Sequence, residues 1–446
     1  MNTRDNLLNL LQIERASQMN LLNITVGGFR NIKLSSLSFD SITALVGLNG
    51  TGKSNLIDAI DFGFDFIHCS TKMRKVMLAS KPEIPILASM AGKNYSFTLE
   101  AKTESTKQPF YIQYGFELSW QTDFSPARIV SEYLNIKRDE KGQKYNTFIS
   151  RKDNNAKYRP SVTGRCDKVI KIDDYTLVLS KLLSFDELFY ADILAEINSI
   201  QYFVERHLDA RPSFEPSPFV IKGFQELELE GIQSIPRAIY YLKQDFNSKF
   251  QLLVNSFRQL FPDIKDIEVD EIKLNQPKKL KISEDAPFMF SDNIYTLSIL
   301  DDRMIQPVSF ERLSDGTKRV FLMLTMAIIA DIKGLSLIAI EEPENSIHPG
   351  LLQNYIDVLS QLINNCKIII TSHSPYVIQC INPHSLYIAH SNDTGESVFE
   401  RIASSKVRAL VLAAAEYDNS VGEYIFNILS SNDARDYLME FLEPNG

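Results

Sequence analysis

The sequence predicts an α/β fold in which a mixed β-sheet carries a phosphate-binding loop, a β-meander and an inserted helical lobe. The glycine-rich stretch GLNGTGKS, residues 47–54, joins an apolar strand to a helical pattern. Apolar residues alternate along 95–99 and 112–120, which is typical of half-buried strands in a meander. Continuous apolar runs at 335–340 and 367–373 lie between helical patterns, which indicates a parallel sheet covered on both faces.

The other elements follow from the spacing of apolar residues. Residues 1–18 are expected to form a short helical extension, and strands are expected at 22–46 and again near 264–274. Helical spacing recurs in four further stretches: 55–67, 175–260, 320–332 and 351–363.

The length of the chain predicts more than one lobe. Its 446 residues exceed the size at which one hydrophobic core stops growing, so we expect two lobes or one domain with a large insertion. Ser314 follows Ser54 by 260 residues, and no sustained heptads lie between them. Without heptads the insertion cannot form a long coiled-coil arm, so we expect a compact helical lobe.

Composition predicts a cytoplasmic protein without a membrane segment. The four cysteines Cys69, Cys166, Cys366 and Cys380 have no CxxC spacing, which disfavours a zinc site or a disulfide framework and favours a reducing compartment. No apolar run approaches the roughly 18 to 20 residues that span a bilayer. The N-terminal residues carry charges where a signal peptide is apolar.

The loop at 47–54 has the GxxxxGK[ST] pattern of a Walker A phosphate-binding loop. Its glycines allow the backbone to turn N–H groups towards phosphate, Lys53 reaches the β and γ oxygens, and the Ser54 hydroxyl binds Mg²⁺ at the helix N-terminus. An exposed lysine after a glycine turn is the alternative. We expect nucleotide to be bound by Asn49, Gly50, Thr51, Gly52, Lys53 and Ser54.

The apolar run 337–340 followed by Glu341 and Glu342 has the form of a Walker B strand. Such a strand delivers carboxylates to its C-terminal end, where one holds the metal's water shell and another orients or deprotonates the attacking water. A pair of glutamates at a helix N-terminus, favoured by the helix dipole, is the alternative.

Two shorter motifs gain meaning beside these. LSDGT starts a helix with Ser314 and Gly316 at its N-terminal end, which offers N–H groups and a hydroxyl to an anion. An ordinary serine-capped helix explains the same residues. His373 follows the apolar strand KIIITS, which places it near the γ-phosphate if that strand neighbours the loop strand. A capped or surface histidine is the alternative.

The charge distribution leaves nucleic-acid binding open. The net charge of -9 disfavours a protein that coats nucleic acid indiscriminately. Residues 128–171, however, contain twelve Lys and Arg against five Asp and Glu, a local charge of +7. This basic segment predicts a solvated hairpin surface or a face that contacts nucleic acid or an acidic partner.

These motifs in this order resemble the ABC-type ATPase heads of the SMC/RecF branch, and in particular small bacterial AAA-type ATP-binding proteins of the kind paired with antiphage defence effectors. The resemblance covers residues 20–390 and is carried by GFRNI, GLNGTGKSNLIDAI, LSDGTKR, IAIEEPENSIHP and ITSHSPYVI. It implies one nucleotide-binding head, split by an insertion. It also implies a head-to-tail dimer that closes on two ATP molecules.

The resemblance implies a role for each motif residue. Lys53 and Ser54 would bind phosphate and Mg²⁺, and Glu342 would be the general base. Glu341 stands where transporter-type heads have Asp and would act on the metal through water. Arg30 would lie beside the nucleotide.

The remaining implied roles belong to the C-terminal motifs. Ser314 and Gly316, the ABC signature, would contact the γ-phosphate held by the other protomer, and His373 would be the switch histidine. His348 stands where transporter heads have an aspartate that signals across the dimer. The Q-loop glutamine has no clear position; Gln113 is the nearest candidate, and a solvent-facing strand residue is the stronger interpretation of it.

The expected organisation has five parts. They are an N-terminal extension (1–18), the N-terminal part of the head (19–172), a helical insertion lobe (173–262), the C-terminal part of the head (263–400) and a helical tail (401–446). The tail has an apolar stripe that either packs on its own domain or docks a partner: Leu410, Ala413, Val421, Ile425 and Leu429.

The sequence thus predicts an ATPase that closes as a homodimer or higher homo-oligomer around Mg-ATP and controls a separate effector in antiphage defence. The alternative is a RecF-like repair or recombination ATPase that binds DNA directly, and salt-dependent DNA binding separates the two. A nuclease of the overcoming-lysogenization-defect type is disfavoured, because only 73 residues without a DxD pair follow His373. The long insertion disfavours the ATPase of an ABC importer.

Overall fold

The computed structural model describes most of the chain and divides it into two compact units. The described residues are 19–79, 84–103, 109–121, 125–185, 187–206, 213–221, 227, 235–274, 286–431, 437–438 and 440–443. The first unit, here the sheet unit, comprises residues 1–204, 334–341 and 365–446, and the second, the helical unit, comprises 205–333 and 342–364. The helix expected at 1–18 lies outside the described residues.

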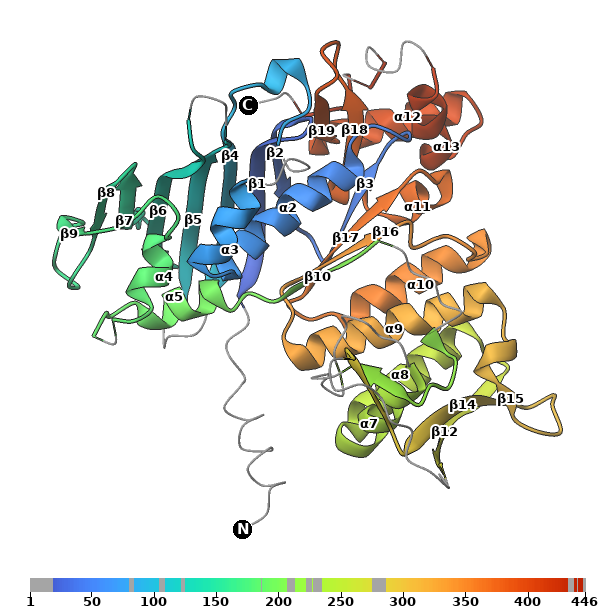
Figure 1. The fold of residues 1–446 in the computed structure, drawn as a ribbon. Helices are drawn as coiled ribbons and strands as arrows, with labels where there is room; N and C mark the ends of the chain where they lie inside the picture. Colours follow the sequence, from blue (N-terminus) through green and yellow to red (C-terminus); the bar gives the residue numbers. More distant parts are fainter. Residues whose placement is uncertain are drawn as a thin grey trace. The chain divides into compact units, whose positions relative to one another are not determined.

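One mixed sheet of fourteen strands, counted over the described residues, forms the sheet unit (Figure 1). In spatial order its strands are β10 (Tyr202–Glu205), β16 (Leu337–Glu341), β17 (Lys367–Ser372), β3 (Ile42–Val46), β18 (Leu386–Ser391), β19 (Ser397–Arg401), β2 (Ile32–Ser38), β1 (Asn20–Phe29), β4 (Tyr95–Thr103), β5 (Phe110–Ser119), β6 (Arg128–Arg138), β7 (Asn146–Lys152), β8 (Asn155–Tyr158) and β9 (Lys168–Ile170). The predicted α/β class with a mixed sheet and a β-meander is confirmed.

The two ends of this sheet differ in strand direction. β16, β17, β3 and β18 run parallel, and all five residues of β3 are buried. From β2 through β9 each strand is antiparallel to the next, which is the predicted meander. Because the carboxyl ends of parallel strands meet at one edge, residues that follow β3, β16 and β17 lie near one another.

The helices of the sheet unit pack on the apolar faces of its strands. They are α2 (Lys53–His68), α3 (Thr71–Leu78), α4 (Val178–Leu182), α5 (Ala191–Asn198), α11 (Pro375–Cys380), α12 (Val407–Glu416) and α13 (Val421–Leu429), with 3₁₀ turns at Ala88–Met90, Pro383–Ser385 and Ser404–Lys406. Of the predicted tail stripe, Leu410, Ile425 and Leu429 are buried.

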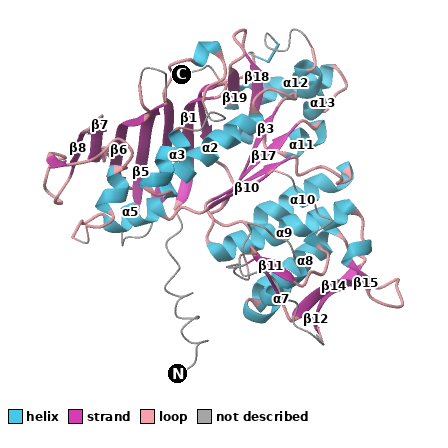
Figure 2. Cartoon of the chain, in the orientation of Figure 1, coloured by secondary structure: helices cyan, strands magenta, loops and turns pink. Residues whose placement is uncertain are grey.

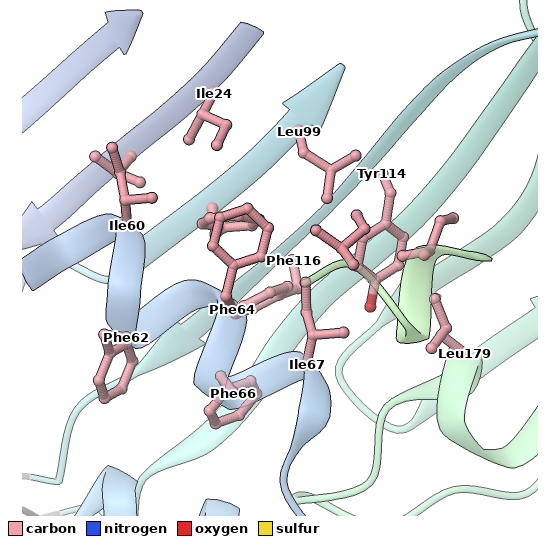
Figure 3. Packing of buried hydrophobic residues seen from close by; sticks show 14 of the residues in the cluster. Ile24, Ile60, Phe62, Phe64, Phe66, Ile67, Leu99, Tyr114, Phe116 and Leu179 are labelled. Carbon is pink, nitrogen blue, oxygen red and sulfur yellow. The ribbon is translucent and has the colours of Figure 1, made fainter. Parts of the chain in front are cut away.

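An aromatic layer fixes α2 on the sheet. Phe62, Phe64 and Phe66 of this helix are buried, and Figure 3 shows them beside side chains of the strands, among them Phe116. The helix comes close because Gly63 has no side chain: a Cβ there would lie 2.1 Å from the Phe97 ring. Burial of each such ring contributes about 1.5 to 3 kcal/mol.

A buried polar network ties the start of α4 to the sheet. Glu132 on β6 is only 1% exposed and accepts hydrogen bonds from the backbone N–H groups of Val178 and Leu179 and from the Tyr114 hydroxyl. Burial raises the pKa of Glu132, opposed by these N–H groups and by Arg151. A carboxylate at a helix N-terminus satisfies donors that the helix cannot satisfy itself.

The helical unit contains four helices in its described part, together with two small sheets (Figure 2). The helices are α7 (Ile235–Asp245), α8 (Asn247–Leu260), α9 (Asp315–Lys333) and α10 (Pro349–Leu362), and a 3₁₀ turn spans Phe310–Arg312. One sheet pairs β11 (Phe219–Ile221) with β13 (Phe288–Phe290), and the other orders β12 (Ile264–Lys273), β14 (Asn293–Asp301) and β15 (Val308–Ser309).

The helices expected as one lobe at 173–262 divide between the two units. α4 and α5 belong to the sheet unit, whereas α7 and α8 belong to the helical unit and pack with α9 and β12. A ring cluster of Phe257, Phe310 and Phe321 supports this second group, with centroids 4.7 to 6.1 Å apart. No described helix is both long and apolar enough to cross a membrane.

Candidate nucleotide site

The glycine-rich loop lies between β3 and α2, as its pattern predicts. Gly50 and Gly52 adopt φ angles of 80° and 90°, a region that favours glycine. Lys53 is 9% exposed, and its ammonium donates to the carbonyl oxygens of Gly47 (2.8 Å) and Leu48 (2.9 Å). The loop is therefore folded around its own lysine.

Close neighbours restrict the two ends of the loop. A Cβ on Gly47 would lie 2.4 Å from the carbonyl oxygen of Ala389 on β18. A Cβ on Gly52 would lie 2.0 Å from the Ser397 hydroxyl oxygen at the start of β19. Within the loop, the Thr51 hydroxyl donates to the Leu48 carbonyl at 2.9 Å, and Asn49 is exposed.

Ser54 and Glu341 come together at the carboxyl edge of the sheet. Glu341 is the last residue of β16, and Ser54 lies in the first turn of α2. The Ser54 hydroxyl donates to Oε2 of Glu341 at 3.2 Å. A hydroxyl and one carboxylate are a fitting donor set for Mg²⁺, which usually completes its octahedron with water and substrate phosphate rather than a protein cage. Among the described residues, no group of three or more His, Cys, Asp or Glu is placed to hold a metal ion.

His373 follows β17 at the same edge of the sheet. Ser372 at the end of β17 pairs with Val46 at the end of β3, and the Gly47 N–H donates to the Ser372 carbonyl at 3.3 Å. The strand order that the histidine interpretation requires is therefore present. The His373 side chain is exposed.

Arg30 begins a chain of polar side chains that the motif pattern did not reveal. Its backbone is left-handed, with φ 47°, and its guanidinium donates to Asn55 (3.0 Å) and Asp58 on the first two turns of α2. Asn55 donates to Asn31 at 2.8 Å, and Asn31 donates to Ser397 at 2.7 Å. Asn31, Asn55 and Asp58 lie within the stretches GFRNI and GLNGTGKSNLIDAI, but only the fold brings them together with Ser397.

The signature residues lie at the start of α9 in the helical unit. The Ser314 hydroxyl accepts the N–H of Thr317 at 3.1 Å, so Ser314 caps the helix. A Cβ on Gly316 would lie 2.1 Å from the Ser346 carbonyl oxygen, so the helix start packs directly on the loop after the Walker B strand.

Glu342 belongs by its contacts to the helical unit, one residue after Glu341. Its backbone is left-handed, with φ 48°. Its Oε2 accepts a hydrogen bond from the Asn345 amide at 2.8 Å, and its carbonyl oxygen accepts one from Nη2 of Arg319 at 2.8 Å. The structure thus brings the site residues together in two groups. Arg30, Lys53, Ser54, Glu341 and His373 lie in the sheet unit, and Ser314, Gly316 and Glu342 lie in the helical unit.

Two further candidates have structural partners. His348 caps α10, with its Nδ1 accepting the Gly350 N–H at 3.1 Å. Gln113 lies within β5, where it donates to Glu100 at 3.0 Å and accepts from Asn135 at 3.1 Å. Gln113 is therefore part of a polar row across neighbouring strands.

The basic segment 128–171 forms strands β6 to β9 and their loops. Lys152 on β7 and Lys157 on β8 are exposed and lie on the same face, because Lys152 pairs with Asn155 and Ser150 pairs with Lys157. Neither lysine forms an ion pair within the described residues. Nearby, the Lys137 ammonium lies 4.9 Å and 4.6 Å from the ring centroids of Tyr111 and Tyr145.

The chain is similar to a family of known proteins and to several solved structures. Residues 42–379 match the profile of a family described as "AAA domain, putative AbiEii toxin, Type IV TA system". Among solved structures, an Smc head bound to the C-terminal winged-helix domain of ScpA is 15% identical, with a TM-score of 0.47 over 86% of this chain and 99% of that one. The SMC head domain from Thermotoga maritima is 14% identical, with a TM-score of 0.38 over 86% of this chain and 100% of that one. An Smc head with an extended coiled coil, bound to the C-terminal domain of ScpA from Pyrococcus furiosus, is 14% identical, with a TM-score of 0.44 over 89% of this chain and 100% of that one.

Proposed function

Because this chain belongs to the family of AAA domains described as putative AbiEii toxin of type IV toxin–antitoxin systems, we propose that it binds and hydrolyses Mg-ATP and uses the cycle to control a partner effector in antiphage defence. A mixed sheet with a phosphate-binding loop between β3 and α2 fits an AAA domain. The observation that carries the proposal is the Ser54 hydroxyl donating to Glu341 at 3.2 Å beside a complete Walker A loop. That pair brings a Mg²⁺ donor set to the residues that would hold phosphate.

The side chains divide the work of hydrolysis. Lys53 leaves the carbonyls of Gly47 and Leu48 and neutralises the β and γ oxygens of ATP. Ser54 and, through water, Glu341 would hold Mg²⁺, which when bound withdraws charge from those oxygens. Glu342 accepts a proton from the water that attacks the γ-phosphorus, and the bond to the bridging oxygen breaks to give ADP and phosphate.

Dimer closure supplies the part of the site that one protomer does not. In the proposed head-to-tail dimer, Ser314 and Gly316 at the N-terminal end of α9 bind the γ-phosphate held by the other protomer, because free N–H groups at a helix start favour anions. ATP then stabilises the closed state more than the open one, and this difference in affinity can drive an effector.

Turnover and mass together test this proposal. We expect purified protein with Mg²⁺ and ATP to release phosphate, Lys53→Ala to abolish both ATP binding and release, and Glu342→Gln to keep binding while lowering release by about 10²- to 10⁴-fold. Native mass spectrometry of Glu342→Gln with ATP is expected to show a dimer that Lys53→Ala does not form. Lys72→Ala and Glu311→Gln, exposed residues on α3 and the Phe310–Arg312 turn, serve as controls. If the Lys53→Ala variant releases phosphate as fast as the wild type does, this site is ruled out.

Direct binding of nucleic acid is the second candidate function, favoured by the exposed lysines of β7 and β8. Their side chains share one face in diagonal positions and form no ion pair within the described part of the chain, so two like charges lie near each other. Phosphate groups would relieve that repulsion. In this alternative the chain is a RecF-like ATPase that grips DNA, and its binding would weaken steeply with salt.

A further inference from the structure

The turn that follows β16 holds Glu342 in an unfavourable backbone conformation. Residues other than glycine rarely adopt a positive φ, and they keep it only where the surrounding structure fixes the backbone. At Glu342 the φ is 48°, and the Asn345 N–H donates to the Glu342 carbonyl at 3.2 Å to close the turn. Asn345 also donates through its side chain to Oε2 of Glu342 at 2.8 Å.

Arg319 supplies a contact that comes from outside this turn. It lies in the second turn of α9, five residues after Ser314, and its Nη2 is 2.8 Å from the Glu342 carbonyl oxygen. Gly316, three residues earlier, packs against the Ser346 carbonyl of the same loop. The start of α9 therefore contacts the loop at both of its ends.

The surroundings of Arg319 suit a fixed guanidinium. Arg319 is partly buried near Glu344 in the loop and Tyr355 on α10, and burial lowers the pKa of Arg319 while these neighbours oppose the shift. The planar guanidinium presents its donors in a rigid fork, so one group can bind the Glu342 carbonyl and meet other neighbours together. A flexible lysine ammonium would fix the loop less well.

We propose that Arg319 is a positioning residue for the Glu342 carboxylate, joining the signature end of α9 to the general base so that the two move together. The inference rests on the proposed function, in which Glu342 accepts a proton from water. Binding of Ser314 and Gly316 to a phosphate would then change the position of Glu342 within the same protomer. Arg319 itself touches neither substrate nor metal in this role.

A double-mutant cycle with Glu342→Gln tests the proposal. Arg319→Met removes the donor with little change in volume, and we expect it to lower kcat by about 10- to 100-fold, because small displacements of a catalytic group are costly. ATP affinity should change by less than about threefold, since the phosphate-binding loop is untouched. In the Glu342→Gln background, where the carboxylate is already gone, Arg319→Met should lower single-turnover phosphate release by less than about threefold.

A buried arginine of the same unit provides the control. Arg237 on α7 is 8% exposed and donates to the Asn293 carbonyl at 3.4 Å, away from the 342–347 loop. Arg237→Met should give the same fold-change in both backgrounds. Arg319→Lys, which keeps a cation in place, gives a second cycle with a smaller loss if Arg319→Met fails to fold.

The outcomes separate this inference from the proposed function. Equal losses for Arg319→Met in the two backgrounds, with wild-type turnover that Lys53→Ala abolishes, overturn the positioning role and leave the ATPase standing. Wild-type protein that neither binds nor hydrolyses ATP overturns both. A loss seen only in the presence of the Glu342 carboxylate supports the role of Arg319.

Discussion

The side-chain amide of Asn31 donates to the hydroxyl of Ser397 at 2.7 Å, although the two residues are 366 positions apart in the sequence. The same hydroxyl oxygen fills the space where a side chain on Gly52 would lie. The second glycine of the phosphate-binding loop is thus required for two reasons, its φ of 90° and the closeness of β19.

Replacing Gly52 with alanine tests the second reason against the first. Both Gly50 and Gly52 have positive φ, but a Cβ on Gly50 meets nothing within 4 Å, whereas one on Gly52 would lie 2.0 Å from Ser397. We expect Gly50→Ala to lower the free energy of unfolding by about 1 kcal/mol through backbone strain. Gly52→Ala should lower it by a further 1 to 3 kcal/mol or so, as overpacking does.

Urea denaturation of both variants measures this difference. Equal losses of unfolding free energy for the two alanine variants would show that Ser397 moves aside freely. The contact between Gly52 and Ser397 would then not restrict the residue at position 52. Gly50→Ala is the matched control because it lies in the same loop with a similar φ.

The buried guanidinium of Arg74 is expected to anchor the end of α2. It is 2% exposed and donates to the carbonyls of Phe66 (2.7 Å) and Ile67 (2.8 Å) and to the Ser180 hydroxyl (2.8 Å). Arg74→Met leaves these acceptors without their donor, so we expect a loss of roughly 2 to 4 kcal/mol. Thermal and urea unfolding are the measurements.

Lys72→Met is the control for this substitution, because Lys72 and Arg74 both lie on α3. Lys72 is exposed, and its removal should change stability by less than about 0.5 kcal/mol. Similar losses for the two variants would contradict the anchoring role of Arg74.

Glu132 should make stability fall as pH rises. Burial raises its pKa above the ordinary value of 4.5, so the folded state keeps the proton to higher pH than the unfolded state does. Its contribution is complete below the unfolded pKa and is lost as pH rises through the raised folded pKa. The Tm of Glu132→Gln minus that of the wild type should therefore increase as the pH rises above the ordinary value of 4.5.

Glu423 provides a comparison of opposite sign. It forms a capping box with Ser420, whose N–H and hydroxyl lower the pKa of Glu423. Its contribution is present above the ordinary pKa and is lost as pH falls through the lowered value. The Tm of Glu423→Gln minus that of the wild type should become less negative on acidification, and slopes of the same sign for both variants would contradict this pair of assignments.

Reversal of charge on the basic strands tests contact with nucleic acid. The double variant Lys152→Glu, Lys157→Glu should weaken binding of a fluorescent DNA duplex and reduce the slope of log affinity against log salt by about 1 to 2, since each phosphate contact contributes about 0.9. Lys93→Glu with Lys406→Glu, also exposed in the sheet unit, reverses the same charge elsewhere. Equal effects of the two double variants would indicate a net-charge effect and remove this face as the contact. Wild-type protein that does not bind DNA would remove the second candidate function.

The sequence predicted best those parts of the site that depend on short stretches of chain. Gly52, Lys53 and Ser54 need only a strand, a turn and a helix, and local spacing reports all three. Glu341 was also within reach, because a buried strand followed by carboxylates implies a position at the sheet edge. These features depend on neighbours along the chain.

Contacts between strands that neighbour each other in the sheet but are distant in the sequence were not predictable. No local pattern indicates that β18 and β19 enter the sheet between β3 and β2, so the partnership of Asn31 with Ser397 had no sequence signal. In the sequence, Arg319 is one more basic residue of a helix, and only the structure shows its contact with the turn at Glu342. The unit in which each helix between residues 173 and 262 packs also has no sequence signal, since periodicity gives helices but not the surface on which each packs.

The position of β3 has a consequence for synthesis of the protein on the ribosome. Its strand neighbours, β17 and β18, begin at residues 367 and 386, whereas β3 ends at residue 46. At about 5 to 20 residues per second, roughly 15 to 65 s separate translation of β3 from translation of its first partner. Throughout that interval the nascent chain exposes both edges of an apolar strand, a target for chaperones and a hazard for aggregation. A chain that stops before β17 would hold the whole phosphate-binding motif yet lack the strands that shape it.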